Sequence, residues 1–325
     1  MVRTGGLATT LAAALWLWPA MDAGADEWPV RPVKIVVAFA PGGSADQFGR
    51  LLAVDLSAAL GQQFFVENRA GNSGAIGSAQ VARAEPDGYT LLIGGSGPHL
   101  TGPAINPNIG YDPLTDFTHI AMIGADSYAW AANPALGVQS IAELVTLAKA
   151  RKQNPITSSS PGPGSLGHLL IEQFKSKAGI DIQHVPAPNS GVTDVLGNHI
   201  SMTLTAMMTV GEQVKAGQLV ALAVTSTERN PVFKGIPTFA EQGGYPDVRG
   251  STWFWLCGPK GLPPDVVNKL SEATRRIVRS PKVQEHFRKL ALLSKDLDVA
   301  AVQAFLTEEY GFWAPLARNA GLKIQ

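Results

Sequence analysis

From residue 33 onward, the chain alternates short apolar runs with amphipathic stretches. The run "VKIVVAF" (33–39) is continuously apolar, which is typical of a strand in a parallel sheet covered on both faces. In the next stretch, Phe48, Leu52 and Leu56 recur on one helical face. The same alternation predicts strands at 63–68 and 89–96 and a helix at 75–84. These elements indicate a first α/β unit.

A long apolar stretch from His119 to Ala132 leads into a second alternation of the same kind. We expect its elements to be helix 141–148, strand 156–160, helix 165–177, strand 181–185, helix 192–197, strand 200–207, helix 211–216 and strand 219–226. A segment rich in Pro and Gly (228–250) then leads to a strand at 252–258. A helix that opens after Pro263 and a last helix at 298–314, which stops near Pro315, complete the pattern.

Two α/β units of similar size, with the chain leaving the first and returning to it, predict two lobes and a cleft. The expected lobe 1 consists of residues 26–122 and 228–325, and the expected lobe 2 of residues 123–227. Ligands of such sheets bind beyond the carboxyl ends of the strands. Both glycine-rich turns described below are placed to face that cleft.

The first 25 residues have the pattern of a secretory signal peptide. Arg3 is followed by an apolar stretch at 7–18 and by the small residues "AGA" at 23–25. A stretch of this length is too short for a membrane span, which needs about 20 residues. We therefore expect an exported protein whose mature part begins near Asp26.

Composition and charge exclude several kinds of partner. The 325 residues contain 26 basic and 26 acidic side chains, so the formal net charge is zero, and no basic patch suggests a nucleic acid. The single cysteine, Cys257, cannot form an internal disulfide, and the six histidines are scattered without metal-ligand spacing. The sequence predicts neither a metal nor a cofactor.

The stretch "PGGSADQ" (41–47) places two glycines directly before a helix. Ser44 and Gln47 form a capping-box pattern, so the helix is predicted to begin at Ser44. The backbone N–H groups of Ser44, Ala45 and Asp46, with the positive end of the helix dipole, would attract a carboxylate or phosphate. Gly43 leaves the backbone open to a ligand. The alternative is a structural turn in which Asp46 only complements the dipole.

The stretch "TSSSPGPGSLGHLL" (157–170) repeats this arrangement in the second unit. Hydroxyls from Ser159 and Ser160 and N–H groups from Gly164 and Ser165 precede a helix that starts near Ser165. His168 lies in its first turn. The stretch also approaches the nucleophile elbow of hydrolases, but Pro occupies the first glycine position and would hinder the tight turn.

A third glycine-rich stretch, "GNSGAIG" (71–77), approaches a dinucleotide-binding fingerprint. Its spacing is G-x-x-G-x-x-G rather than G-x-G-x-x-G, and no acidic residue is clearly placed after a following strand. A glycine-rich helix start facing the cleft is the favoured interpretation.

Several segments together resemble the Bug receptors, the periplasmic substrate-binding proteins of tripartite tricarboxylate transporters. They are "WPVRPVKIVVAFAPGGSADQFGRLL", "VENRAGNSGAIGSAQVARAEPDGYTLLIG", "YDPLTDFTHIAMIG", "SSPGPGSLGHLLIEQF", "LAVTSTERNPVFKGIPTFAEQG" and "LPPDVVNKL". The resemblance runs in order over nearly the whole mature chain. It implies a two-lobed, hinged periplasmic binding fold, of the Venus flytrap type II kind, that closes over a small carboxylated ligand.

The resemblance also implies a ligand site formed by one loop from each lobe, at 41–46 and 158–165. The predicted ligand-binding residues are Gly43, Ser44, Ala45, Asp46, Ser96, His99, Ser159, Ser160, Gly164, Ser165, His168, Ser190 and Thr205. Ser201 and Thr205 occupy positions where the family often has Asp, and Ala187 occupies a Tyr position. We take the missing second Asp to disfavour an amino-acid ligand and to favour a substrate with an uncharged nitrogen or a purely carboxylic one, aliphatic or aromatic.

The expected function is therefore that of a periplasmic, non-catalytic receptor. It would bind a small organic acid as a monomer and present it to the membrane components of the transporter. Two alternatives remain open at the level of the sequence. One is a receptor that presents its ligand to a membrane sensor kinase, and the other is an exported hydrolase that uses Ser165, with Asp194 and His199 following in the required order.

Overall fold

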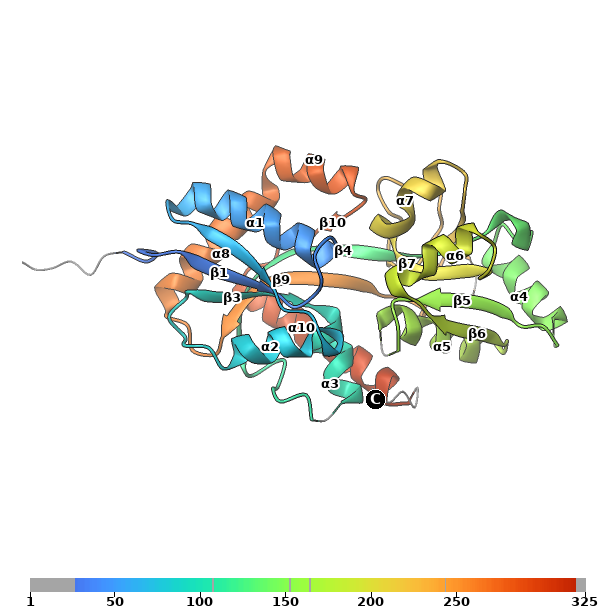
Figure 1. The fold of residues 1–325 in the computed structure, drawn as a ribbon, viewed down its shortest axis with the longest axis horizontal. Helices are drawn as coiled ribbons and strands as arrows, with labels where there is room; N and C mark the ends of the chain where they lie inside the picture. The colour runs from blue at the N-terminus through green and yellow to red at the C-terminus, as the bar shows by residue number, and fades with distance from the viewer. Residues whose placement is uncertain (1–26, 107, 152, 164, 243, 320–325) are drawn as a thin grey trace, which may run out of the picture.

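A computed structural model describes residues 27–106, 108–151, 153–163, 165–242 and 244–319 (Figure 1). The predicted signal peptide and Gly164 lie outside the described residues. The molecule consists of two α/β lobes side by side, as the sequence predicts. Within the described residues, no helix has the length and apolar character needed to span a bilayer.

The sheet of lobe 1 has the order β2-β1-β3-β9-β4. Its first three strands are parallel, β9 is antiparallel to both of its neighbours, and the short strand β10 also pairs with β4. The strands of lobe 1 are β1 (Val33–Val37), β2 (Phe64–Asn68), β3 (Thr90–Gly95), β9 (Ser251–Pro259) and β10 (Leu293–Ser294).

Helices cover both faces of this sheet, which explains the continuous apolar run of β1. Val33, Ile35 and Val37 pack on the face covered by α1 (Ser44–Leu60), α8 (Pro264–Arg279) and α9 (Pro281–Lys289). Val36 packs on the other face, against α2 (Ala75–Ala82) and α10 (Val299–Asn319). Because successive side chains of a strand point to opposite faces, both sets must be apolar.

The sheet of lobe 2 has the order β8-β4-β7-β5-β6. Its remaining strands are β5 (Ile156–Ser160), β6 (Ile182–Pro186), β7 (Met202–Ala206) and β8 (Val220–Val224). Its helices are α4 (Ile141–Ala150), α5 (Leu166–Ala178), α6 (Val192–Leu196) and α7 (Met207–Lys215). Shorter turns in the two lobes are η1 (Asn72–Gly74), η2 (Gly97–Thr101), α3 (Gly102–Ile105), η3 (Pro134–Leu136) and η4 (Pro188–Gly191).

One strand, β4 (Phe117–Ala132), belongs to both sheets. Its residues 117–127 pair with β9 in lobe 1, and its residues 128–132 pair with β7 or β8 in lobe 2. Helix α10 also bridges the lobes, because Leu306 packs in lobe 1 and Trp313 in lobe 2. The lobes are therefore joined by β4, by the β8–β9 segment and by α10.

Three features differ from the expected pattern. Helix α7 begins at Met207 directly after β7, four residues before the predicted start. The last helix does not stop near Pro315 but continues to Asn319 with that proline inside it. Ala317, in its last turn, is fully buried, so packing outweighs the roughly 3 kcal/mol that a helical proline costs. Helix α9 and the short turns at 97–105 were not expected.

Candidate ligand-binding site

The first half of the candidate site is the start of α1, where the helix begins at Ser44 as predicted. The expected capping box is not formed, because the N-cap is Gly43 and no side chain caps the helix. Gly42 adopts a φ of +91°, a conformation that favours glycine. Both glycines are exposed. The first turn therefore presents backbone N–H groups that no side-chain cap occupies.

Asp46 holds this loop in place through three hydrogen bonds. Its Oδ2 accepts the Gly42 N–H at 3.0 Å and the Arg50 Nε–H at 2.9 Å, and its Oδ1 accepts a bond from Asn68 at 2.9 Å. Burial alone would raise the pKa of Asp46, but these hydrogen bonds lower it below its ordinary value. The carboxylate is thus directed toward its own loop.

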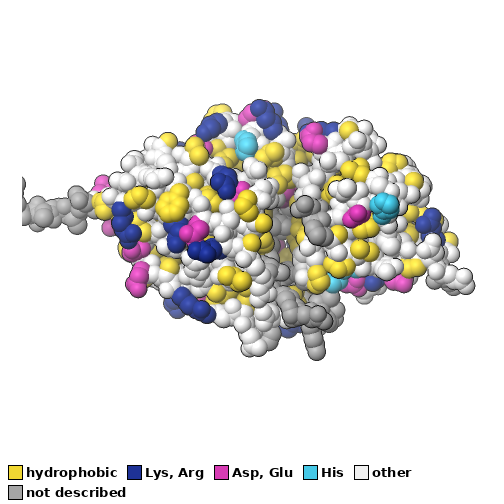
Figure 2. Space-filling model, viewed as in Figure 1, with side chains coloured by type: hydrophobic (Ala, Val, Ile, Leu, Met, Phe, Trp, Pro, Cys, Tyr) yellow, Lys and Arg dark blue, Asp and Glu magenta, His cyan; other side chains and the backbone are white. Residues whose placement is uncertain are grey.

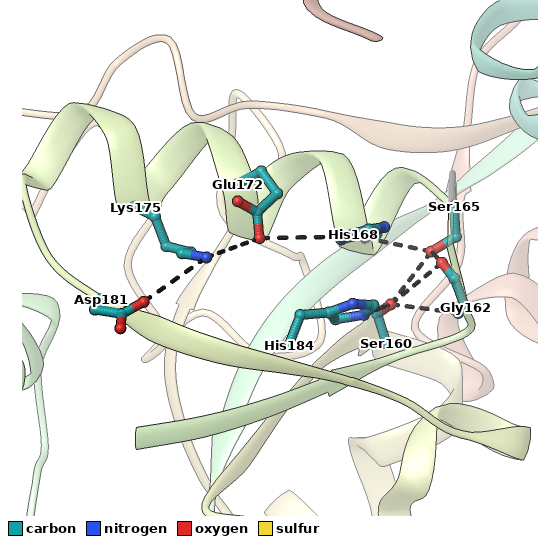
Figure 3. Close-up of polar contacts among 8 residues, drawn as sticks. All are labelled: Ser160, Gly162, Ser165, His168, Glu172, Lys175, Asp181 and His184. Carbon is teal, nitrogen blue, oxygen red and sulfur yellow. Dashed lines mark hydrogen bonds and ion pairs between the residues drawn. The ribbon is translucent and has the colours of Figure 1, made fainter. Parts of the chain in front are cut away.

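The second half of the candidate site is the start of α5, in lobe 2 (Figure 3). Ser165 is the N-cap: its Oγ accepts the His168 N–H at 3.3 Å and donates to the Gly162 carbonyl at 2.7 Å. Ser160 Oγ lies 3.4 Å from Ser165 Oγ and 2.7 Å from His184 Nε2. The prediction that this helix starts near Ser165 is confirmed.

Two stacked histidine rings, His168 and His184, lie next to this loop. His168 and His184 stack with their centroids 3.8 Å apart and their planes inclined by 13° (Figure 3). Burial, together with the neighbouring His168, lowers the pKa of His184 to about 4. At neutral pH, His184 is therefore uncharged and hydrogen-bonds to Ser160.

The geometry around Ser165 does not form a hydrolase triad. Its hydroxyl bonds to the Gly162 carbonyl and to the His168 backbone rather than to an imidazole. Ser160 and His184 do form a Ser–His pair, but in the described part of the chain no carboxylate hydrogen-bonds to His184. A triad requires a third group that orients the base.

Other predicted site residues of lobe 2 hold the η4 loop. Ser159 Oγ donates to the Ser190 carbonyl at 2.6 Å, and Thr205 Oγ1 donates to Ser190 Oγ at 2.6 Å. All three residues are buried. Ser190 has a φ of +59°, and its bonds to β5 and β7 fix this conformation. These hydroxyls therefore join the strand ends to the loop.

Two other predicted ligand-binding residues of lobe 1, Ser96 and His99, do not lie on α1 or its loop. Ser96, at the end of β3, accepts the Trp253 N–H at 2.8 Å and so joins β3 to β9. His99 is 1% exposed and is surrounded by Tyr111, Phe117 and Trp255. Burial lowers the pKa of His99 to about 3. His99 thus lies in the interior of lobe 1, apart from the two helix starts.

Asp126 is a buried carboxyl in contact with the start of α1, and the sequence analysis did not single it out. It lies on β4, between the lobes, and is fully buried. Its Oδ2 accepts the Ser44 hydroxyl at 3.1 Å, and its Oδ1 accepts the Met208 N–H at 3.3 Å. Burial raises the pKa of Asp126 to about 7. The available signal was its position as the only Asp, Glu, Lys or Arg among residues 117–132.

A separate cavity lies where the end of β8, the start of β9, the α9–β10 segment and α10 meet. Its volume is about 580 Å³, and its lining includes Arg249, Lys295 and Glu309 but none of the predicted ligand-binding residues. Among the described residues, no three His, Cys, Asp or Glu side chains are grouped so that they could hold a metal ion.

The face of the molecule drawn in Figure 2 shows a hollow between the lobes and mixed surface charge. A narrow groove separates the two lobes in Figure 2, and on that face positive and negative side chains are interspersed without a large patch of one sign.

Comparison with known proteins identifies one family. A family model described as "Tripartite tricarboxylate transporter family receptor" matches residues 48–322. The curated protein BugT of Bordetella pertussis is 34% identical over 309 residues, which cover 94% of each chain.

Three solved structures have the same fold. The periplasmic binding protein BugD has a TM-score of 0.80 and 32% identity, covering 92% of this chain and all of its own. An R. palustris protein with adipate, Rpa4515, has a TM-score of 0.83 and 31% identity, covering 91% and 99%. MatC from Rhodopseudomonas palustris, with bound malate, has a TM-score of 0.78 and 25% identity, covering 89% and 100%.

Proposed function

The chain belongs to the tripartite tricarboxylate transporter receptor family, whose members are periplasmic solute-binding receptors and not enzymes, and from this premise we propose that it captures a small dicarboxylate between its lobes. The observation that carries the proposal is the pair of helix starts, one in each lobe. The start of α1 presents N–H groups that no side chain caps, and the start of α5 adds the hydroxyls of Ser160 and Ser165. Relatives of the same fold bind adipate and malate.

One ligand carboxylate would bind at the start of α1. The N–H groups of Ser44 and Ala45 and the positive end of a 17-residue helix attract an anion there. Gly43 carries no side chain that would block its approach. Asp46 serves this site as a positioning residue, because its carboxylate holds the Gly42 N–H.

The other ligand carboxylate would bind at the loop 160–165. Ser165 and Ser160 supply hydroxyls, and the stacked pair of His168 and His184 supports them. We include Gly164 in this loop on sequence grounds. Ser159, Ser190 and Thr205 act one step further away, because their hydroxyls bond to one another and to the η4 backbone.

Contact with both lobes would make the ligand drive closure. A ligand shifts a conformational equilibrium only by its difference in affinity for the two states, and only the closed form brings both helix starts onto one molecule. We propose that residues 128–227, with the part of α10 around Trp313 that packs on them, move as one lobe relative to lobe 1. The boundary predicted from the sequence, at residue 123, differs because residues 123–127 of β4 pair in the sheet of lobe 1. The motion would bend β4 near the point where its pairing changes sheets, between Ser127 and Tyr128.

The closed form would then be recognised by the membrane components of the transporter. We propose that the receptor works as a monomer, because one chain supplies both halves of the site, and that residues 1–25 direct its export. Presentation to a sensor kinase would use the same closed form, and it remains the alternative for the partner.

A ligand screen tests this proposal. Malate, adipate, phthalate, citrate, aspartate and glutamate are each added to the purified mature protein, and thermal unfolding is followed. A ligand at 100 times its dissociation constant adds about 2.7 kcal/mol of stability. We expect a dicarboxylate that carries no amino group to stabilise the protein. No response to any carboxylate, or tight binding of aspartate or glutamate alone, would refute the proposal.

A Ser165→Ala variant separates binding from hydrolysis. Because the Ser165 hydroxyl must exchange its bond to the Gly162 carbonyl for one to the ligand, its loss should cost about 0.5–1.5 kcal/mol, which lowers the affinity for the dicarboxylate about two- to tenfold. Ser140→Ala is the matched control, because Ser140 is the N-cap of α4 in the same lobe and is not among the predicted ligand-binding residues. Turnover of an ester by the parent protein, lost in Ser165→Ala, would instead establish the hydrolase.

A further inference from the structure

The buried carboxyl of Asp126 contacts the first turns of two helices, α1 in lobe 1 and α7 in lobe 2. Ser44, the first residue of α1, reaches it from lobe 1, and the backbone of Met208, in the first turn of α7, reaches it from lobe 2. The side chain is fully buried. In the described part of the chain, no Lys, Arg or His forms an ion pair with it. A carboxyl in this setting has polar partners but no compensating charge.

The protonation state of Asp126 decides what the Ser44 hydroxyl can do. When Asp126 is ionised, the carboxylate accepts the Ser44 hydrogen, and Ser44 can then offer a ligand only its lone pairs. When Asp126 is protonated, its own O–H can donate to Ser44 Oγ at the same 3.1 Å, which frees the Ser44 hydrogen to bond to a ligand carboxylate. Protonation thus converts Ser44 from an acceptor into a donor.

Charge acts in the same direction as hydrogen bonding. A ligand carboxylate at the start of α1 and an ionised Asp126 would be two like charges near a shared hydroxyl, and like charges disfavour ionisation. The only titratable neighbour on β4 whose pKa reflects this charge is Tyr128, since burial and then Asp126 raise the pKa of its phenol to about 12. On β9, the residues opposite Asp126 and Ser127 are uncharged.

The charged side chains of the surrounding elements are occupied with other groups. The pairs and contacts are Asp46 with Arg50 on α1, Glu212 with Lys215 on α7, Glu285 with Arg288 on α9, and Lys295 with the rings of Trp253 and Phe305. Because these side chains are already paired, the charge of a bound ligand carboxylate is the main change in the electrostatic surroundings of Asp126.

We propose that capture of a carboxylate ligand is coupled to the uptake of one proton by Asp126. The inference rests on the proposed function, and it extends that function from a binding site to a proton-coupled one. The free protein has a pKa of about 7 at Asp126, and the ligand's negative charge raises it further. At pH 8, capture should take up as much as about 0.9 proton, and at pH 6 only about 0.1, because the free carboxyl is then already protonated.

The affinity should follow the same linkage. The affinity falls by up to about tenfold from pH 6 to pH 8, because binding requires a protonated Asp126 and the concentration of free protons is lower at pH 8. An amine-bearing ligand would give the opposite sign, because an ammonium beside Asp126 stabilises the ionised form.

Isothermal titration calorimetry with adipate or malate tests the coupling. The binding enthalpy is measured at pH 6 in MES and in bis-Tris and at pH 8 in HEPES and in Tris, two pairs of buffers without phosphate or carboxylate whose ionisation enthalpies differ, and the dependence on buffer gives the number of protons taken up. Asp126→Asn should lose the uptake at pH 8 and show little change of affinity between the two pH values. Any proton exchanged by the ligand itself remains in this variant and can be subtracted.

Glu309→Gln is the matched control. Glu309 is another buried carboxyl whose pKa is raised by burial, but it lies on α10 beside Trp313 and lines the separate cavity. It should show the same uptake as the parent. Binding without uptake at pH 8, or uptake that persists in Asp126→Asn, overturns this inference and leaves the proposed function standing. Failure to bind any carboxylate overturns both.

Discussion

Gly167, the second residue of α5, allows the first turn of the helix to pack against the backbone of β7. A Cβ at this position would lie 2.7 Å from the Leu204 carbonyl oxygen and 3.2 Å from Ser160 Cβ and from a ring carbon of Tyr128. Carbon–oxygen contacts begin near 3.3 Å, so Gly167→Ala must move the helix start by about 0.6 Å. The shift displaces Ser165 and with it the lobe 2 half of the site.

The expected cost can be estimated from two opposing effects. Alanine in a helix is favoured over glycine by up to about 1 kcal/mol, whereas an added carbon in a packed site costs about 1–3 kcal/mol. The overlap with a backbone oxygen, which cannot change rotamer, places Gly167→Ala toward the upper end. We expect a net loss of about 1–2 kcal/mol in the free energy of unfolding and a several-fold loss of dicarboxylate affinity.

Urea unfolding monitored by tryptophan fluorescence measures the stability, and calorimetry with the dicarboxylate found in the screen measures the affinity. Gly311→Ala provides the comparison, because it is the same substitution in helix α10 and its Cβ meets no atom within 4 Å. Gly311→Ala should raise the stability by up to about 1 kcal/mol. A Gly167→Ala protein with the stability and affinity of the parent would refute the idea that contact with β7 positions the α5 start.

Three further substitutions have defined outcomes. Asp46→Ala removes the three hydrogen bonds that hold the loop, so urea unfolding should show a loss of about 1–3 kcal/mol and dicarboxylate binding should weaken. Unchanged binding would remove Asp46 from the positioning role. Asp126→Asn should stabilise the protein at pH 8 but not below pH 4. The pKa of Asp126 is about 7 in the folded protein against an ordinary 3.8, so keeping this carboxyl ionised in the folded state costs at most about 4 kcal/mol above pH 7. Equal urea midpoints of the two proteins at pH 8 would contradict this. The pKa of His184 is about 4 in the folded protein against an ordinary 6.5. Its contribution to stability is therefore complete above pH 6.5 and is lost as the pH falls toward 4. His184→Gln should flatten the dependence of the urea midpoint on pH in this range.

The sequence predicts the elements that local patterns determine. The apolar run of β1, the starts of α1 and α5, and the return of the chain to lobe 1 all follow from periodicity and from glycine placement. Helix α9 was missed, although Ser280 before Pro281 is a start signal and Ser280 does act as its N-cap. The error at Pro315 has a different origin, because long-range packing of Ala317 outweighs the local preference.

Pairings between distant residues account for the rest of the site. Ser44 was expected to cap its own helix, but a carboxyl 82 positions away takes its hydroxyl. Similarly, the stacking of His168 on His184 depends on β6 lying beside β5 and α5. No local pattern contains this information, since it arises only when the sheets assemble.

The order of strands in lobe 1 has a consequence for synthesis. Strand β9 lies between β3 and β4, yet it is the last long strand of the chain, at Ser251–Pro259. Lobe 2 has all of its strands once Val224 has been made, whereas the sheet of lobe 1 then still lacks the strand that joins β3 to β4. A nascent or truncated chain that ends before β9 therefore exposes the facing edges of β3 and β4, and unpaired apolar edges of this kind recruit other chains. Fragments that end before residue 251 should aggregate, even though they contain the complete loops at the starts of α1 and α5.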